Sequence, residues 1–195
     1  MRRRLVMPLM VAGLLATALP AHASVSVQME DFRFNPRNEL LAQGAQLTWF
    51  NAGTVNHTST QDGPLKFWNT GQVAPSMFSN AVTLWAAGRF TYHCNNHPFM
   101  TGIVRIPVTA STATLTLGEP VTITMSSSFT FKGYTFDVQR RRDDKAWVTF
   151  KTGVGTASIE TTPKRVGEFR YRARIVNLSG ATGGWSPVTA VSVTV

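Results

Sequence analysis

The sequence predicts an all-β protein with two β-sandwich units. Short segments alternate apolar and polar residues, which is the pattern of half-buried strands. Glycine and proline separate these segments, and no stretch repeats its apolar residues with a helical period. The pattern ends in a small, threonine-rich segment at about 107–114 and then starts again. We therefore expect one domain over residues 24–108, a linker at 107–114 and a second domain over residues 109–195.

The first 23 residues predict an export signal. A basic head, Arg2-Arg3-Arg4, precedes an apolar run from Leu5 to Leu19, and Ala21-His22-Ala23 supplies small residues at a cleavage point. The run is short for a membrane span, so we expect none after cleavage. A mature chain from Ser24 would then work outside the cytoplasm, in a periplasm or beyond the cell. A retained membrane anchor is the alternative.

The expected domain over residues 24–108 contains five segments with the strand pattern. A long polar and aromatic loop separates the second from the third. Short strands punctuated in this way are typical of a sandwich or barrel. The five segments are 25–29 extended through Phe32 and Phe34, 46–51, 77–84, 88–94 and 101–108.

The expected domain over residues 109–195 contains seven alternating segments, which predicts a seven-stranded sandwich. In the sixth segment three arginines alternate with apolar residues, so we expect the arginines on one solvated face and the apolar side chains in the core. The seven segments are 114–117, 121–125, 134–139, 147–150, 157–160, 169–175 and 188–195.

Positive charge is concentrated in the second half of the chain. The whole sequence has a formal net charge of +9, and residues 109–195 hold eleven Lys and Arg against six Asp and Glu. This excess predicts attraction to an acidic surface or polymer. We do not expect nucleic-acid binding, because Tyr171 falls on the face opposite the neighbouring arginines. Arg140-Arg141-Arg142 before Asp143-Asp144 predicts a charged hairpin tip.

The stretch from Tyr92 to Met100 carries the chemistry that the sequence predicts. Cys94 is the one cysteine of the chain, His97 follows it by three residues, and Met100 follows by three more. A single cysteine in an exported protein has no internal disulfide partner, and metal ligation as a thiolate would protect it. With His57 upstream, the donors are one thiolate, two imidazoles and one thioether.

This donor set favours copper over zinc. A thiolate with two imidazoles and a weak, distant thioether is the ligand set of a blue-copper electron-transfer site. Structural zinc sites instead use further cysteines or histidines. We therefore predict one copper ion bound by His57, Cys94, His97 and Met100. His93 points away from the side of Cys94 in an alternating strand, so we assign it a structural or electron-exit role.

Residues 24–108 resemble the cupredoxin family. The loop from Tyr92 to Gly102 looks most like the short ligand loop of amicyanin, with plastocyanin and pseudoazurin as relatives, and Gly88-Arg89-Phe90-Thr91-Tyr92 matches the family's approach to the cysteine. The resemblance implies a Greek-key sandwich with the four donors as type 1 copper ligands. It also implies that Pro98 and Phe99, beside an exposed His97, form an apolar docking face for redox partners. Thr58 departs from the family, which has an asparagine there that ties the two ligand loops together.

Residues 109–195 resemble a fibronectin type III module more loosely, and any immunoglobulin-like sandwich is the alternative. The resemblance is carried by the segment 134–139, Trp147, the segment 169–175 and Gly184-Trp185-Ser186-Pro187.

The first functional hypothesis is an exported type 1 copper protein that carries single electrons and is not an enzyme. One alternative is a copper carrier or sequestering protein without turnover. Another is a surface recognition protein whose second domain binds the partner.

Overall fold

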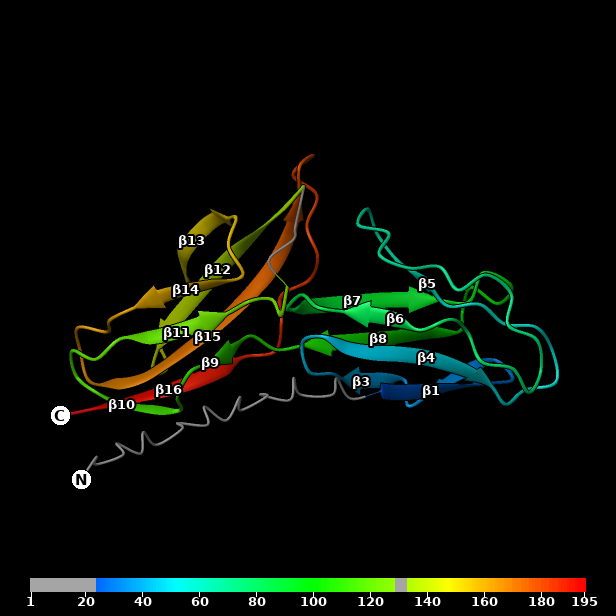
Figure 1. The fold of residues 1–195 in the computed structure, drawn as a ribbon, viewed down its shortest axis with the longest axis horizontal. Coiled ribbons are helices and arrows are strands. Elements are labelled where there is room, and N and C mark those ends of the chain that lie inside the picture. Colours follow the sequence, from blue (N-terminus) through cyan, green and yellow to red (C-terminus); the bar gives the residue numbers. More distant parts are fainter. Residues whose placement is uncertain (1–23, 129–132) are drawn as a thin grey trace, which may run out of the picture.

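The structure is a computed structural model that describes residues 24–128 and 133–195. The predicted export signal, residues 1–23, lies outside the described residues. Within them the chain forms strands, turns and loops and no helix, so the predicted all-β fold class is confirmed (Figure 1). The described residues accordingly include no helix long and apolar enough to cross a membrane.

Residues 24–106 form two four-stranded sheets (Figure 1). Strand β1 pairs with β4 in parallel and with β2 in antiparallel fashion, whereas β7 and β8 are antiparallel neighbours. The first sheet has the order β2 (Arg33–Asn35), β1 (Ser24–Glu30), β4 (Ala45–Asn51) and β6 (Val82–Leu84). The second has the order β3 (Asn38–Leu40), β8 (Thr101–Ile106), β7 (Gly88–His93) and β5 (Thr60–Gln61).

Alternate residues of these strands form the core between the sheets. In β4 and β7 every second side chain is buried, as the period of two requires. Trp49 of β4 lies 5.7 Å from Tyr92 of β7, measured between ring centroids, and 5.7 Å from Trp68. All three rings are buried. Large aromatic side chains dominate such a core because each removes much apolar area from water, and Tyr92 fixes the strand that leads into Cys94.

Two expectations for the first sheet are wrong in detail. Phe32 does not continue the first strand: it lies in the turn between β1 and β2 with φ of 70° and is 51% exposed. The segment 77–84 is a strand only over β6. In its first part, Ser79 donates from its backbone N–H to the carbonyl of Trp49, while Met77 and Phe78 are exposed.

Residues 109–194 form two further sheets (Figure 1). Each of the seven predicted segments overlaps one strand, and β12, β13 and β15 extend beyond the predicted bounds. An additional strand, β9 (Thr109–Ala110), lies in the predicted linker and pairs with β11. The larger sheet has the order β10 (Thr114–Thr116), β16 (Thr189–Thr194), β15 (Gly167–Asn177), β12 (Tyr134–Arg142) and β13 (Val148–Val154). The smaller has the order β14 (Ser158–Thr161), β11 (Val121–Thr124) and β9.

The arginines of β15 do not form a freely solvated face. Phe169, Tyr171, Ala173 and Ile175 are buried, as the alternation predicts. On the opposite side the arginines stack on aromatic rings: the guanidinium carbon of Arg172 lies 4.2 Å from the ring of Trp147, and that of Arg174 lies 4.7 Å from the ring of Trp185. Polar partners on β12 complete the row, because Arg172 donates to Gln139 and Arg174 to Asp137. Arg172 and Arg174 on this face are therefore each stacked on the ring of a tryptophan.

The two halves of the chain meet near the start of β7. The backbone N–H of Ala87 donates to the carbonyl of Met125 over 2.7 Å, and Arg89 and Gly184 exchange two backbone hydrogen bonds. Strand β7 runs from this junction to the loop that carries Cys94, which lies at the far end of the strand (Figure 1). The division into domains at residue 108, and the fibronectin-like nature of the second one, stay predictions.

Candidate metal centre

The loop between β7 and β8 is a compact set of turns closed by its own backbone. The N–H of Cys94 donates to the carbonyl of Met100 over 3.0 Å. The N–H of His97 donates back to Cys94 over 3.1 Å, and the N–H of Met100 donates to His97 over 2.8 Å. Three of the four predicted donors are therefore fixed relative to one another by a single seven-residue segment, before any metal is considered.

His57 comes to this loop from the segment between β4 and β5. Its backbone pairs with that of Val73 through two hydrogen bonds of 3.2 and 2.8 Å. Asn51 holds the same region, because its side-chain amide donates to the carbonyls of Val55 and Val73 over 2.8 Å each. The His57 side chain is completely buried, so packing and hydrogen bonds together determine where its ring lies.

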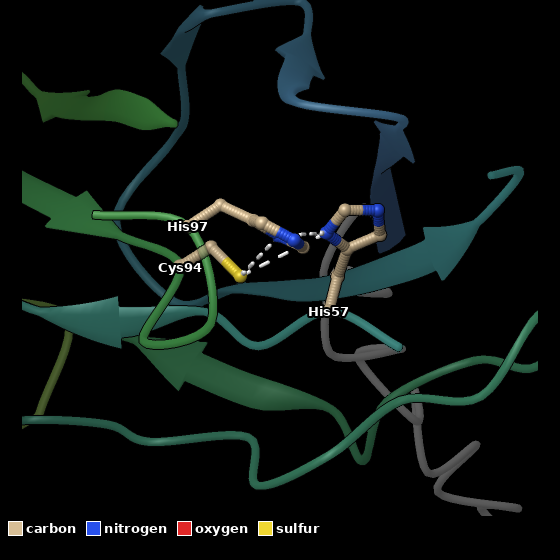
Figure 2. Close-up of side chains that lie close together, drawn as sticks. All are labelled: His57, Cys94 and His97. Atoms are coloured by element: carbon tan, nitrogen blue, oxygen red, sulfur yellow. Dashed lines mark hydrogen bonds between the residues drawn. The ribbon is translucent and has the colours of Figure 1, made fainter. Parts of the chain in front are cut away.

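Three of the predicted donor atoms converge on one point (Figure 2). The sulfur of Cys94 lies 3.7 Å from Nδ1 of His57 and 3.7 Å from Nδ1 of His97, and the two nitrogens are 3.2 Å apart. Cys94 and His57 are fully buried, whereas His97 is partly exposed. The site thus presents one sulfur and two nitrogens to a shared centre and opens to solvent only through His97.

The triangle of donors fits a transition-metal ion. A point equidistant from three corners separated by 3.7, 3.7 and 3.2 Å lies about 2.1 Å from each corner. Metal–nitrogen and metal–sulfur bonds in proteins measure about 2.0 to 2.3 Å. A trigonal arrangement of one thiolate and two imidazoles is the equatorial set of blue-copper sites. Both the donor chemistry and the spacing therefore suit copper.

Met100 ends the loop immediately before β8, and its side chain is 1% exposed. The backbone hydrogen bonds with Cys94 and His97 keep it in the same compact turn. The backbone of Met100 therefore lies close to the backbones of Cys94 and His97. The role of its thioether as the fourth, axial donor stays a prediction.

Thr58 ties the two ligand-bearing segments together. Its backbone N–H donates to the sulfur of Cys94 over 3.3 Å, and its hydroxyl accepts a 2.7 Å hydrogen bond from the N–H of Asn95. The side chain is 2% exposed. The backbone and the hydroxyl of this one threonine thus join the His57 segment to the Cys94 loop. A second tie runs from the side-chain amide of Asn96 to the carbonyl of Asn56.

Asp31 is the nearest charged group to the far side of His57. One carboxylate oxygen lies 3.5 Å from Nε2 of His57, which has no hydrogen bond of ordinary geometry among the described residues. Asp31 is itself oriented by Thr54, whose N–H and hydroxyl both donate to the carboxylate over 2.8 Å. Burial lowers the pKa of His57 below 6.5, and nearby His97 adds to this, although Asp31 opposes both. The lowered pKa favours the neutral imidazole, which is the form that binds a metal.

The structure places His93 apart from the three donors. Its Nδ1 lies 2.5 Å from a carboxylate oxygen of Asp62, and the ring is about one third exposed. Strand alternation therefore predicted its direction correctly. His93 pairs with β5 across the sheet, which supports a structural role.

Two exposed phenylalanines flank the ring of His97. Phe32 contacts it edge-on with 4.9 Å between centroids, and Phe99 lies 6.2 Å away. They are 51% and 70% exposed, respectively. Phe32 was not predicted here, because alternation assigned it to a strand. We call Phe32, His97, Pro98 and Phe99 the apolar rim.

Comparison with known proteins finds structural likeness only. No protein-family model matches the chain, and no curated protein sequence matches it. A Cu-containing nitrite reductase from Thermus scotoductus is 23% identical over 49% of this chain, with a TM-score of 0.40, and the match covers 24% of that protein. A reduced Cu(I) form of an amicyanin variant is 24% identical over 44% of this chain and 84% of its own, with a TM-score of 0.39. A purple cupredoxin from Nitrosopumilus maritimus is 19% identical over 43% of this chain and 98% of its own, with a TM-score of 0.38.

Proposed function

We propose that this protein binds one copper ion at His57, Cys94 and His97 and carries single electrons between partner proteins outside the cytoplasm. The observation that supports this most directly is the donor triangle, whose centre lies a metal–ligand bond length from one sulfur and two nitrogens. Bound copper would supply the chemistry, by alternating between its +1 and +2 states with one electron taken up and one released.

Each donor has a distinct part in this proposal. Cys94 as thiolate forms the strongest bond and couples the metal electronically to β7. His57 and His97 would hold the ion through Nδ1, and the thioether of Met100 would be a further, weak donor that tunes the reduction potential. The N–H of Thr58, 3.3 Å from the sulfur, withdraws charge from the thiolate and thereby favours the lower oxidation state.

The protein lowers the cost of electron transfer by holding the donors still. The loop carries three backbone hydrogen bonds of its own, and Thr58 joins it to the His57 segment. His57 and Cys94 are fully buried, so neither ring nor thiol can turn toward water. Donors fixed in one arrangement need little movement when the metal gains or loses an electron.

Electrons would enter and leave through His97. It is the one donor of the triangle that reaches solvent, and Phe32 and Phe99 of the apolar rim lie beside its ring. Exposed aromatic side chains around a small polar centre are typical of a protein docking face. We therefore propose that redox partners dock on Phe32, Pro98 and Phe99 and exchange electrons across the His97 ring.

Copper titration combined with voltammetry tests this proposal. We expect one copper per chain, reversible one-electron cycling, and retention of the metal against a modest chelator. His57→Gln should lose tight binding, whereas His93→Gln, which removes a histidine outside the triangle, should keep both stoichiometry and cycling. Copper that binds but does not cycle, and that passes readily to the chelator, would instead support a carrier or sequestering protein.

A further inference from the structure

A basic groove lies where β12 ends. Its volume is about 350 Å³, which is in the range of small-molecule sites. Four of its lining residues are uncharged and contribute a small, partly apolar floor: Ala146, Val148, Thr162 and Phe169. The other six are all cationic, and we call them the groove cations: Arg140, Arg141, Arg142, Lys145, Lys164 and Arg165.

Three separate segments bring these cations together. The end of β12 supplies three arginines, the turn between β12 and β13 supplies Lys145, and the connection between β14 and β15 supplies Lys164 and Arg165. Antiparallel pairing of β12 with β15 sets Arg142 opposite Phe169, which brings that connection alongside the hairpin. The triple arginine does lie at a hairpin end, as predicted, and Lys145 lies in the turn of that hairpin, but the fold adds Lys164 and Arg165 from elsewhere in the chain.

The carboxylates near the groove are already engaged. Asp143 lies 3.4 Å from Arg142 and also accepts the backbone N–H of Glu168. Asp144 and Glu168 both pair with Arg170, which is not a lining residue. Within residues 24–128 and 133–195, the other five groove cations have no carboxylate within ion-pair distance. Like charges gathered without counterions repel one another, and an anion would relieve that repulsion.

Two of the unpaired arginines are held in position by aromatic rings. The guanidinium carbon of Arg140 lies 4.1 Å from the ring centroid of Phe150, and that of Arg141 lies 5.1 Å from that of Trp147. Stacking covers the flat face of a guanidinium and leaves its N–H edge available for hydrogen bonds. Nε of Arg141 is buried, and no acceptor for it lies among the described residues. Stacking therefore holds the guanidinium groups of Arg140 and Arg141 in place at the groove before any anion binds.

We propose that the basic groove binds a multiply charged phosphate-bearing ligand. A phosphate monoester offers three acceptor oxygens and nearly two negative charges, whereas a carboxylate offers two oxygens and one charge. The fixed fork of arginine matches a phosphate in bidentate fashion, and lysine ammonium groups add point charges around it. Five cations without a carboxylate partner suit the larger charge. The same group can belong to a soluble phosphate compound or to a lipid headgroup.

The groove is separate from the candidate metal centre. In Figure 1 β15 starts at the left of the molecule, close to the end of β12, whereas β7 ends at the right. No groove residue belongs to the donor triangle or to the apolar rim. Anion binding therefore does not depend on the copper proposal, and either can fail without the other.

In the first arm of the test, the protein is titrated with inorganic pyrophosphate and binding is measured by calorimetry. The second arm measures cosedimentation with phosphatidylcholine vesicles that contain phosphatidic acid, against phosphatidylcholine alone. The groove variant is Lys145→Gln with Lys164→Gln and Arg165→Gln, all three being exposed. The matched control removes three exposed positive charges elsewhere, by Lys66→Gln with Arg89→Gln and Arg105→Gln. Circular dichroism of both variants checks that they fold.

We expect the groove variant to bind at least about tenfold more weakly than the unaltered protein and the control variant to change by less than about threefold. Added salt should weaken binding further, since exposed charges are screened. Binding of pyrophosphate alone would assign a soluble ligand, and binding of acidic vesicles alone would assign a lipid headgroup. Absence of binding in both arms, or equal weakening in the two variants, would overturn the proposal.

Discussion

The hydroxyl of Thr58 offers the sharpest test of how the candidate metal centre is held together. Thr58→Val keeps the size and branching of the side chain but removes the oxygen that accepts the N–H of Asn95 over 2.7 Å. The backbone N–H of Thr58 still donates to the sulfur of Cys94, because the substitution does not alter the backbone. The change therefore removes the hydrogen bond from Asn95 and the long, 3.9 Å contact from the hydroxyl to the sulfur of Cys94, while the backbone contact stays.

The expected cost follows from the burial of the donor that is left behind. Removing one partner of a hydrogen bond and leaving the other shielded from water costs about 1–3 kcal/mol. Thr58 is 2% exposed whereas Asn95 is an exposed residue, so the bond is only partly buried and we expect a value in the lower half of this range, about 1–2 kcal/mol. For a chain of this length, each kcal/mol lowers the melting temperature by about 2–4 °C. When both proteins are free of metal, the Thr58→Val variant should therefore melt several degrees lower than the unaltered protein.

Hydrogen exchange at the Asn95 amide is the decisive assay. In Thr58→Val this amide should exchange about tenfold faster or more, since 1.4 kcal/mol corresponds to a factor of ten. Thr58→Ser is the matched control: it loses a methyl group but keeps the acceptor, so Asn95 should stay protected. If Thr58→Val leaves both the Asn95 exchange rate and the melting temperature unchanged, the two loops are not joined through this hydroxyl.

Three further predictions follow from particular contacts. Gly102→Ala should lower the free energy of unfolding by about 1–3 kcal/mol, because an added Cβ overlaps the ring of Tyr92. At Gly155 an added Cβ meets nothing within 4 Å, so Gly155→Ala should leave this free energy nearly unchanged in urea unfolding. Burial lowers the pKa of His57 in the folded protein below its unfolded value of 6.5, so the unfolded chain takes up the proton first as the pH falls. The metal-free protein should therefore lose stability as the pH falls below 6.5. His57→Gln should weaken this pH dependence of the unfolding free energy, measured by urea titration between about pH 8 and about pH 5. Met100→Leu should raise the copper reduction potential in voltammetry, because loss of a weak donor disfavours Cu(II) more than Cu(I), and an unchanged potential would remove Met100 from the ligand set.

Local patterns in the sequence were sufficient to predict most of the strands. Alternation of apolar and polar residues is decided by which face is buried, and burial follows it closely in β4, β7 and β15. The pattern could not predict the turn at Phe32, because an exposed aromatic residue and a buried one look the same in a single sequence. It also could not predict β9, a two-residue strand whose pairing with β11 depends on distant residues.

Residue types and spacing were sufficient to bring three donors together. Cys94 and His97 lie on one short loop, so their proximity is local, and the upstream His57 was chosen by its donor type. The residues around the three donors were harder to predict from the sequence. Asp31 reaches His57 from a turn 26 positions earlier in the chain, and a carboxylate at that distance has no local signature. The role of Thr58 depends on its contact with Asn95 across the site, which only the structure provides.

The same limit applies to the second half of the chain. The alternation in β15 predicted which side chains enter the core, but not that Trp147 and Trp185 would cover the arginines on the other side. Likewise, the sequence presented Arg140-Arg141-Arg142 as one charged hairpin tip. Folding adds Lys164 and Arg165 from the β14–β15 connection, and the combined groove exists only in three dimensions.

The most direct test of the account is the visible absorption and electron paramagnetic resonance spectrum of the protein loaded with Cu(II). We expect an intense blue band and an unusually narrow copper hyperfine splitting, both lost in Cys94→Ser and both kept in His93→Gln. These signals arise from a thiolate bound to copper between two imidazoles. A pale protein with a wide splitting, unchanged by Cys94→Ser, would mean that the thiolate of Cys94 does not bind the metal and that the protein is not a blue-copper electron carrier.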